Sequence, residues 1–278
     1  MQMNCAWNEF LAILPPEMRC DVDKLGKEGL QELRLRLGQP PELVCHGGSR
    51  WLPKSVTSDD LSFVIHTASR YSPWSSATAA SGYITAQGGH RIGICGAVVV
   101  KEDRPTGIRI PTALCLRVAR DFSGIAEDVK RLKGNILILG PPGSGKTTLL
   151  RDLIRQISDS GMGSVAVVDE RGELFPTGFY SGRRTDVLTG CSKRYGLEMV
   201  LRTMGPTCIA VDEITQEADC IALMQCSWCG VRILATAHAA SLDDLKRRPI
   251  YKALWETKIF DAVVIMRTDK SWYTERIS

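Results

Sequence analysis

The segment GPPGSGKT, residues 140–147, decides the fold of this chain. It fits the pattern G-x-x-x-x-G-K-[ST] at every position, follows the apolar run Ile136–Leu139 and precedes the helix-like stretch TLLRDLIRQI. Glycines let backbone N–H groups approach a phosphate, and the N-terminus of the following helix adds the positive end of its dipole. The sequence therefore predicts a phosphate-binding loop between a buried strand and a helix.

Two residues of this loop have predicted chemical roles. Lys146 is expected to reach the β- and γ-phosphates of a nucleoside triphosphate, and the Thr147 hydroxyl to ligate Mg²⁺. A chance glycine-rich turn is the alternative, but the flanking strand and helix disfavour it. The residues expected to contact the nucleotide are Gly140, Pro141, Pro142, Gly143, Ser144, Gly145, Lys146, Thr147 and Thr148.

A second motif, CIAVDE at residues 208–213, is an apolar strand that ends in two carboxylates. In a parallel sheet such a strand end lies beside the phosphate loop. Asp212 is then expected to hold Mg²⁺, through water, and Glu213 to act as the base or orienter for the attacking water. The alternative is an ordinary solvated loop start, which the phosphate loop upstream disfavours.

Two further strand ends carry candidate residues. The stretch VVDERGE presents Glu170, which is expected to act as a catalytic residue by touching the Mg²⁺ shell or the attacking water; the alternative is a loop salt-bridged through Arg171. The stretch LATAH ends in Thr236 and His238, which are placed to sense the γ-phosphate. The alternative for His238 is a packed histidine with satisfied hydrogen bonds.

Hydrolysis also requires positive charge that stabilises the transition state, which an arginine finger often supplies from a neighbouring subunit. Most surface arginines are merely solvated, so the pattern alone does not select one. Arg202 is included among the catalytic candidates, and the full set is Arg109, Arg117, Arg120, Arg184 and Arg202.

The pattern of apolar residues along the chain changes near Gly134. Before it, alternating strands, short helices and the pair Gly88-Gly89, placed as a two-residue hairpin turn, predict a small α+β domain at residues 1–122. The polar stretch 123–134 is expected to be a linker. Residues 135–278 hold short apolar strands separated by helix-like segments, which predicts an α/β domain with a largely parallel sheet.

Composition narrows the function classes. The chain has 278 residues, a net charge of +4 and 44% hydrophobic residues, typical of a soluble globular protein. Residues 1–133 carry 17 basic and 14 acidic side chains, and residues 134–278 carry 18 and 17, so neither half favours nucleic acid as a partner. No apolar run approaches a membrane span, and no export signal is visible. The 10 cysteines are therefore expected to be reduced thiols in a cytosolic compartment, with no zinc at Cys226 and Cys229.

The order of the four boxes resembles the secretion ATPase superfamily, the hexameric motors of type II and type IV secretion and of pilus retraction. Its Walker A, Asp, Walker B and His boxes match residues 140–147, 169–173, 209–213 and 236–238. The more specific stretches GYITAQGGHRIGICG and DERGEL resemble the sporulation ATPases of endospore-forming bacteria. The resemblance extends from about Glu32 to about Arg267.

This resemblance implies a RecA-like P-loop ATPase that uses ATP and Mg²⁺ and assembles as a homo-oligomer, a hexameric ring. It implies action from the mother-cell cytoplasm on membrane proteins of a sporulation channel, peripheral to the membrane. One departure is that Thr215-Gln216 stand where pilus motors carry an arginine, whose role is not transferred. Two alternatives stay open: a RecA-like motor on nucleic acid, and a nucleotide-bound scaffold that hydrolyses slowly.

Overall fold

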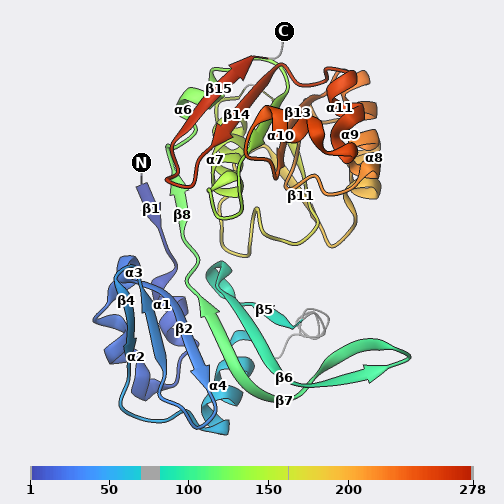
Figure 1. Cartoon of the computed structure of the whole chain (residues 1–278). Coiled ribbons are helices and arrows are strands. Elements are labelled where there is room, and N and C mark those ends of the chain that lie inside the picture. The colour runs from blue at the N-terminus through green and yellow to red at the C-terminus, as the bar shows by residue number, and fades with distance from the viewer. Residues whose placement is uncertain (1, 70–81, 162, 277–278) are drawn as a thin grey trace. The chain divides into compact units, whose positions relative to one another are not determined.

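The computed structural model describes residues 2–69, 82–161 and 163–276. Contacts between Cα atoms divide the chain into two compact units, each described here by itself (Figure 1). The larger unit holds Met1–Gln2, Phe122–Phe175 and Tyr180–Ser278, and the smaller holds Met3–Asp121 and Pro176–Phe179. Within the described residues, no helix combines the length and apolar character that crossing a membrane requires.

The larger unit is built on a seven-stranded sheet in the order β11-β10-β12-β13-β9-β14-β15. Its strands are β9 (Ile136–Leu139), β10 (Val165–Asp169), β11 (Thr185–Thr189), β12 (Cys208–Val211), β13 (Arg232–Ala237), β14 (Ala262–Met266) and β15 (Trp272–Arg276). Neighbouring strands run parallel except β14 and β15, which are antiparallel. The predicted α/β fold with a largely parallel sheet is confirmed.

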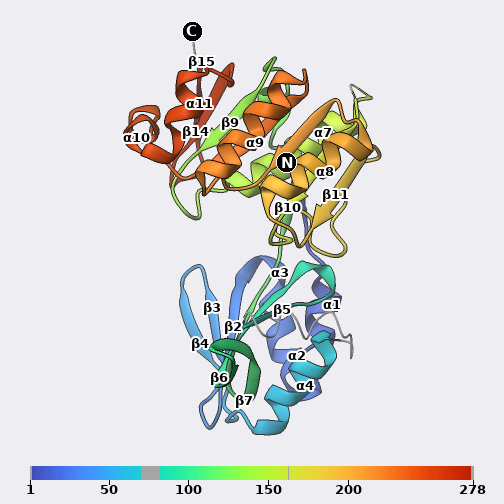
Figure 2. The same cartoon turned by 90° about the vertical axis from the view of Figure 1, so that its right-hand side faces the viewer.

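Helices cover both faces of this sheet because successive side chains of each strand are apolar and point to opposite faces. Ile136 and Ile138 of β9 are buried with residues of α6 and α7, whereas Leu137 and Leu139 are buried with residues of α8, α9 and α11. Figure 2 shows α8 and α9 side by side. The helices are α6 (Glu127–Lys130), α7 (Lys146–Asp159), α8 (Lys193–Met204), α9 (Glu217–Trp228), α10 (Leu242–Arg247), η2 (Pro249–Tyr251) and α11 (Lys252–Glu256).

The stretch 123–134, expected to be a linker, contains α6. Its Ala126 and Val129 are fully buried in the core of the larger unit. The carboxylate of Asp152, on α7, accepts backbone N–H bonds from Ile125 and Ala126 and so fixes the chain directly before this short helix.

The smaller unit is built on a six-stranded antiparallel sheet in the order β4-β3-β2-β7-β6-β5. Gly88 and Gly89 have φ of 80° and 78°, as a turn between strands requires, but β5 pairs with β6 across residues 86–90, so the predicted two-residue turn has five residues. Its elements are α1 (Trp7–Ala12), α2 (Pro16–Asp23), α3 (Gly26–Gly29), β2 (Leu30–Arg36), β3 (Glu42–Cys45), β4 (Gly48–Trp51), α4 (Ser58–Ser69), β5 (Tyr83–Thr85), η1 (Gln87–Gly89), β6 (Arg91–Lys101) and β7 (Arg104–Arg117). Two further short strands, β1 (Gln2–Asn4) and β8 (Asp121–Ser123), pair with each other in a separate two-stranded sheet.

Candidate active site

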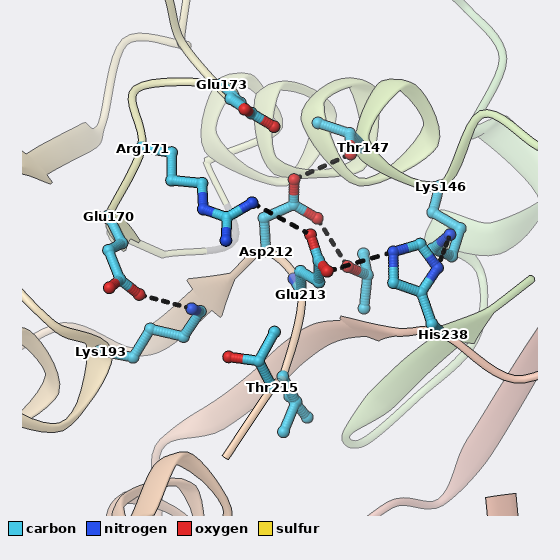
Figure 3. Close-up of polar contacts among 12 residues, drawn as sticks. Lys146, Thr147, Glu170, Arg171, Glu173, Lys193, Asp212, Glu213, Thr215 and His238 are labelled. Atoms are coloured by element: carbon cyan, nitrogen blue, oxygen red, sulfur yellow. Dashed lines mark hydrogen bonds and ion pairs between the residues drawn. The ribbon is translucent and has the colours of Figure 1, made fainter. Parts of the chain in front are cut away.

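The four motifs meet because their strands are parallel and therefore end at the same edge of the sheet. The phosphate loop follows β9, and the other three motifs follow β10, β12 and β13. The strand order places β13 between β9 and β12. His238, which follows β13, therefore lies between Lys146 on one side and Glu213 on the other (Figure 3).

Lys146 is the first residue of α7, and its side chain is folded back onto its own loop. Its Nζ donates to the carbonyl oxygens of Gly140 at 2.9 Å and Pro141 at 3.0 Å, and lies 3.0 Å from Nδ1 of His238. The residue is only 6% exposed. Burial lowers the pKa of Lys146, and the nearby carboxylates of Asp212 and Glu213 oppose that shift. An anionic ligand at this loop would give the ammonium a stronger partner than two carbonyl groups.

The loop has the backbone geometry that close approach to a phosphate requires. Gly143 and Gly145 have φ of 75° and 98°, in the region that glycine adopts without strain. A Cβ at Gly140 would lie 2.9 Å from the carbonyl oxygen of Met266, so no larger residue fits there. The Ser144 hydroxyl is buried and has no hydrogen-bond partner among the residues that the structure describes, which leaves it available to a ligand.

The remaining predicted loop residues differ in exposure. Pro142 is exposed, whereas Pro141 and Thr148 are half-buried. Thr148 lies in the first turn of α7, directly after Thr147.

Asp212 lies between two threonine hydroxyls. Oγ1 of Thr147 donates to its Oδ2 at 2.8 Å, and Oγ1 of Thr236 donates to its Oδ1 at 2.6 Å. Burial raises the pKa of Asp212, and these two hydrogen bonds oppose the shift. A hydroxyl and a carboxylate oxygen in contact are hard ligands of the kind that Mg²⁺ takes, usually with waters and substrate phosphates completing the shell. The pair formed by Thr147 and Asp212 therefore fits a magnesium ion.

Glu213 is held in an unusual backbone conformation. Its φ is 51°, a left-handed value that costs energy for any residue except glycine and that often marks a functional site. Its backbone N–H donates to Oγ1 of Thr236 at 2.8 Å, so one hydroxyl fixes both carboxylate residues of the motif. The guanidinium group of Arg171 faces the Glu213 carboxylate, with Nη1 4.0 Å from Oε2.

His238 connects the phosphate loop with Glu213. Its Nε2 lies 3.2 Å from Oε1 of Glu213, while its Nδ1 faces Lys146. Because an ammonium group only donates, Nδ1 accepts from Lys146, and Nε2 carries the proton that is donated to Glu213. The hydrogen bonds thus select one tautomer of the ring.

The two acidic residues at the end of β10 have different partners. Asp169 is 2% exposed and accepts backbone N–H bonds from Glu173, Leu174 and Phe175, so its carboxylate shapes the following loop. Burial raises the pKa of Asp169, and these three bonds oppose the shift. Glu170 points instead to the ammonium group of Lys193, at 2.7 Å.

The candidate arginines have other partners or belong to the smaller unit. Arg202 is exposed on α8 and forms an ion pair with Glu198 at 2.7 Å. Arg184 donates to the carbonyl oxygen of Gly161. In the smaller unit, Arg109 is exposed, Arg117 pairs with Glu32 at 3.1 Å, and Arg120 donates to the carbonyl oxygens of Lys27 and Leu30.

Sequence reasoning missed two features of the site. Lys193 is a single lysine at the start of a helix, in a segment that carries no recognisable motif. Thr236 was expected to sense a phosphate, whereas its hydroxyl is bonded to Asp212 and Glu213. Its place at the end of β13 was the signal, but the identity of its partners depended on the strand order.

Comparison with known proteins shows the family to which this sequence is similar. A family model described as "Sporulation stage III, protein AA" matches residues 8–275. Stage III sporulation protein AA of Bacillus subtilis (strain 168) is 35% identical over 274 residues, which are 91% of this chain and 89% of that protein. Protein SEEDLING PLASTID DEVELOPMENT 1 of Arabidopsis thaliana is 28% identical over 258 residues, 88% of this chain and 35% of that protein.

Two solved structures share the backbone arrangement. The pilus retraction motor PilT with bound ADP is similar with a TM-score of 0.63 and 17% identity, over 90% of this chain and 76% of PilT. The ATPase DotB of Legionella pneumophila is similar with a TM-score of 0.59 and 16% identity, over 93% of this chain and 78% of DotB. These likenesses show a shared fold.

Proposed function

Because the chain belongs to the family described as sporulation stage III, protein AA, we propose that it is a P-loop ATPase that binds ATP with Mg²⁺ and hydrolyses it in an assembly of identical subunits. The observation that carries this proposal is the continuous contact from Lys146 through His238 to Glu213, beside the pair formed by Thr147 and Asp212. It supplies, at one sheet edge, the groups that phosphoryl transfer to water requires.

Each residue has a proposed role. Lys146 leaves its loop carbonyls and binds the β- and γ-phosphates, with the loop residues 140–148 around them. Thr147 and Asp212 would hold Mg²⁺, which when bound neutralises charge on the phosphate oxygens. Glu213 orients the attacking water and accepts its proton, and His238 holds Glu213 in place. Glu170 is a second carboxylate beside the site, whose part is argued further below.

The wider role is proposed from the same family membership. We propose a ring, with six subunits as the expected number, that acts in the mother-cell cytoplasm on membrane proteins of a sporulation channel. A ring would also supply a transition-state cation in addition to Arg171, the arginine whose side chain lies near Glu213. An arginine of a neighbouring subunit is the proposed source, with Arg202 among the candidates.

The test is the release of phosphate from ATP by the purified full chain, with and without Mg²⁺. The matched variant is Lys146→Ala, which removes the ammonium that binds the phosphates, while the core that supports the loop is unchanged. We expect Mg²⁺-dependent turnover in the parent and none in the variant, with similar unfolding temperatures. Equal turnover in both would remove the proposal. Stimulation by DNA or RNA would favour a nucleic-acid motor instead, and binding without turnover would favour a scaffold.

A further inference from the structure

A buried cation outside the phosphate loop lies at the edge of the site. Lys193, the first residue of α8, is 5% exposed. Its Nζ lies 2.7 Å from Oε2 of Glu170 and 4.0 Å from Oδ2 of Asp219. Lys193 and Glu170 share the lining of a small hollow with Arg171, Glu213 and Thr215, so the pair borders the place where Glu213 is expected to hold water.

The two carboxylates near Lys193 are not equivalent. Oδ2 of Asp219 already accepts the backbone N–H groups of Thr215 and Gln216, at 3.1 and 3.2 Å, and so fixes the start of α9. Within the described part of the chain, Glu170 has no comparable set of backbone donors, and it forms the short contact to Lys193. A buried ammonium that loses its partner is strongly unfavourable, so the contact to Glu170 is the one that keeps Lys193 paired.

The pair also determines where the Glu170 carboxylate lies. Glu170 and Arg171 are neighbours in sequence, yet Figure 3 shows their side chains directed to different partners, Glu170 to Lys193 and Arg171 toward Glu213. The site must accept an anionic triphosphate although Asp212, Glu213 and Glu170 all border it. An unpaired carboxylate here would repel the ligand.

We propose that Lys193 is a positioning residue that holds the Glu170 carboxylate as a neutral pair, away from the phosphates, so that the site admits a triphosphate and Glu213 alone orients water. This inference rests on the proposed ATPase function. Lys193 acts through Glu170 and need not touch the nucleotide. Its loss should therefore matter only while residue 170 carries a negative charge.

The test measures binding of the ATP analogue AMP-PNP and of ADP, each with Mg²⁺, together with steady-state hydrolysis of ATP. In Lys193→Met, the freed Glu170 carboxylate should weaken AMP-PNP binding on the order of tenfold, a modest figure because Glu170 is partly exposed and screened. ADP, which lacks the γ-phosphate, should lose less than about threefold. KM for ATP should rise more than kcat falls.

The decisive comparison is the double variant Lys193→Met/Glu170→Gln, which should bind AMP-PNP as the parent does, while Lys193→Arg should keep most of the affinity. Lys193→Gln, which retains a donor for both carboxylates, replaces Lys193→Met should that variant unfold.

Lys252→Met is the matched control: Lys252 begins α11, is exposed and lies 3.7 Å from Glu256. It should leave binding unchanged.

Two results would overturn the inference while leaving the ATPase function intact. One is a Lys193→Met defect that persists with Gln at position 170 or that affects ADP equally. The other is a Glu170→Gln variant that loses as much kcat as Glu213→Gln, because Glu170 would then act on the reaction itself. A parent chain that binds neither nucleotide would overturn both the proposed function and this inference.

Discussion

The ammonium nitrogen of Lys146 lies 3.0 Å from Nδ1 of His238, although 92 positions separate the two residues in the chain. The same ring reaches Glu213 through Nε2 at 3.2 Å. A phosphate that takes Lys146 away from its loop carbonyls also takes one hydrogen bond from the ring. His238 is thereby in contact with both the group expected to bind phosphate and the group expected to activate water.

This contact predicts a selective defect in His238→Ala. Glu213 would lose the donor that orients Oε1, and misplacement of a reacting group by about 1 Å can cost up to about 10²-fold in rate. We expect kcat for ATP to fall on the order of 10–10²-fold, with little change in AMP-PNP binding. The control is His66→Ala, at an exposed histidine of α4. An unchanged kcat in His238→Ala would show that the ring does not orient Glu213.

The two acidic residues after β12 should separate binding from turnover. Glu213→Gln keeps an oxygen that accepts from His238 but loses the proton acceptor, so ATP should bind with Mg²⁺ and turn over about 10²–10⁴-fold more slowly. Asp212→Asn should instead weaken Mg²⁺-dependent binding, because the carboxylate beside Thr147 loses its charge. Binding titrations with and without EDTA, combined with phosphate release, distinguish the two variants. Identical behaviour would contradict this division of roles.

Activity should depend on self-association. An arginine finger is worth about 10³–10⁵ in rate, and the candidates Arg109 and Arg202 are both exposed on a single chain. Specific activity should therefore rise steeply with protein concentration, in step with the mass of the assembly. A rate per subunit that stays constant in a strict monomer would exclude a finger in trans.

Mixing inactive subunits identifies the arginine. A subunit with Arg109→Ala or Arg202→Ala retains a nucleotide site, and a Lys146→Ala subunit retains the arginine. If the substituted arginine acts on a neighbour, the mixture should recover part of the turnover that each protein lacks alone. A mixture that stays as inactive as its components would exclude that arginine as a finger. The mixture made with the other arginine variant serves as the control.

The smaller unit has a predicted pH dependence that does not involve the active site. His90 is fully buried; its Nε2 lies 2.8 Å from the carbonyl oxygen of Ala6, and its Nδ1 accepts the N–H of Ala119 at 3.1 Å. The ring is therefore neutral with the proton on Nε2, and burial lowers the pKa of His90. Below the pKa of an exposed histidine, near 6.5, the unfolded chain binds a proton that the folded chain does not.

The free energy of unfolding should accordingly fall as pH decreases from about 7 toward 5, through the His90 contribution. The glutamine in His90→Gln does not titrate, so the free energy of unfolding of this variant should depend less steeply on pH in that range. At pH 7 we expect the variant to have a lower free energy of unfolding than the parent. Urea denaturation at several pH values gives both slopes, with His66→Gln as the control. Equal slopes for His90→Gln and the parent would show that His90 titrates alike in the folded and unfolded chains.

Much of the site could be predicted because its signals are local. Glycines at 140, 143 and 145 and the apolar run before them determine a strand, a tight loop and a helix start within a dozen residues. The apolar strands that lead to Asp212 and Asp169 were recognisable for the same reason, since strands buried on both faces are continuously apolar. The expectation that parallel strands bring these motifs to one edge needed only the direction of the strands, and the fold it implied is confirmed.

The sequence by itself thus determined the larger unit's fold class and the glycine-rich loop between β9 and α7. Only the tertiary structure decided which side chains meet. The position of β13 between β9 and β12 places Thr236 against Asp212 and His238 against Lys146, and the packing of α8 beside β10 brings Lys193 to Glu170. Local patterns cannot specify such contacts, because the order of strands depends on how the crossover helices bury their apolar faces across the whole sheet.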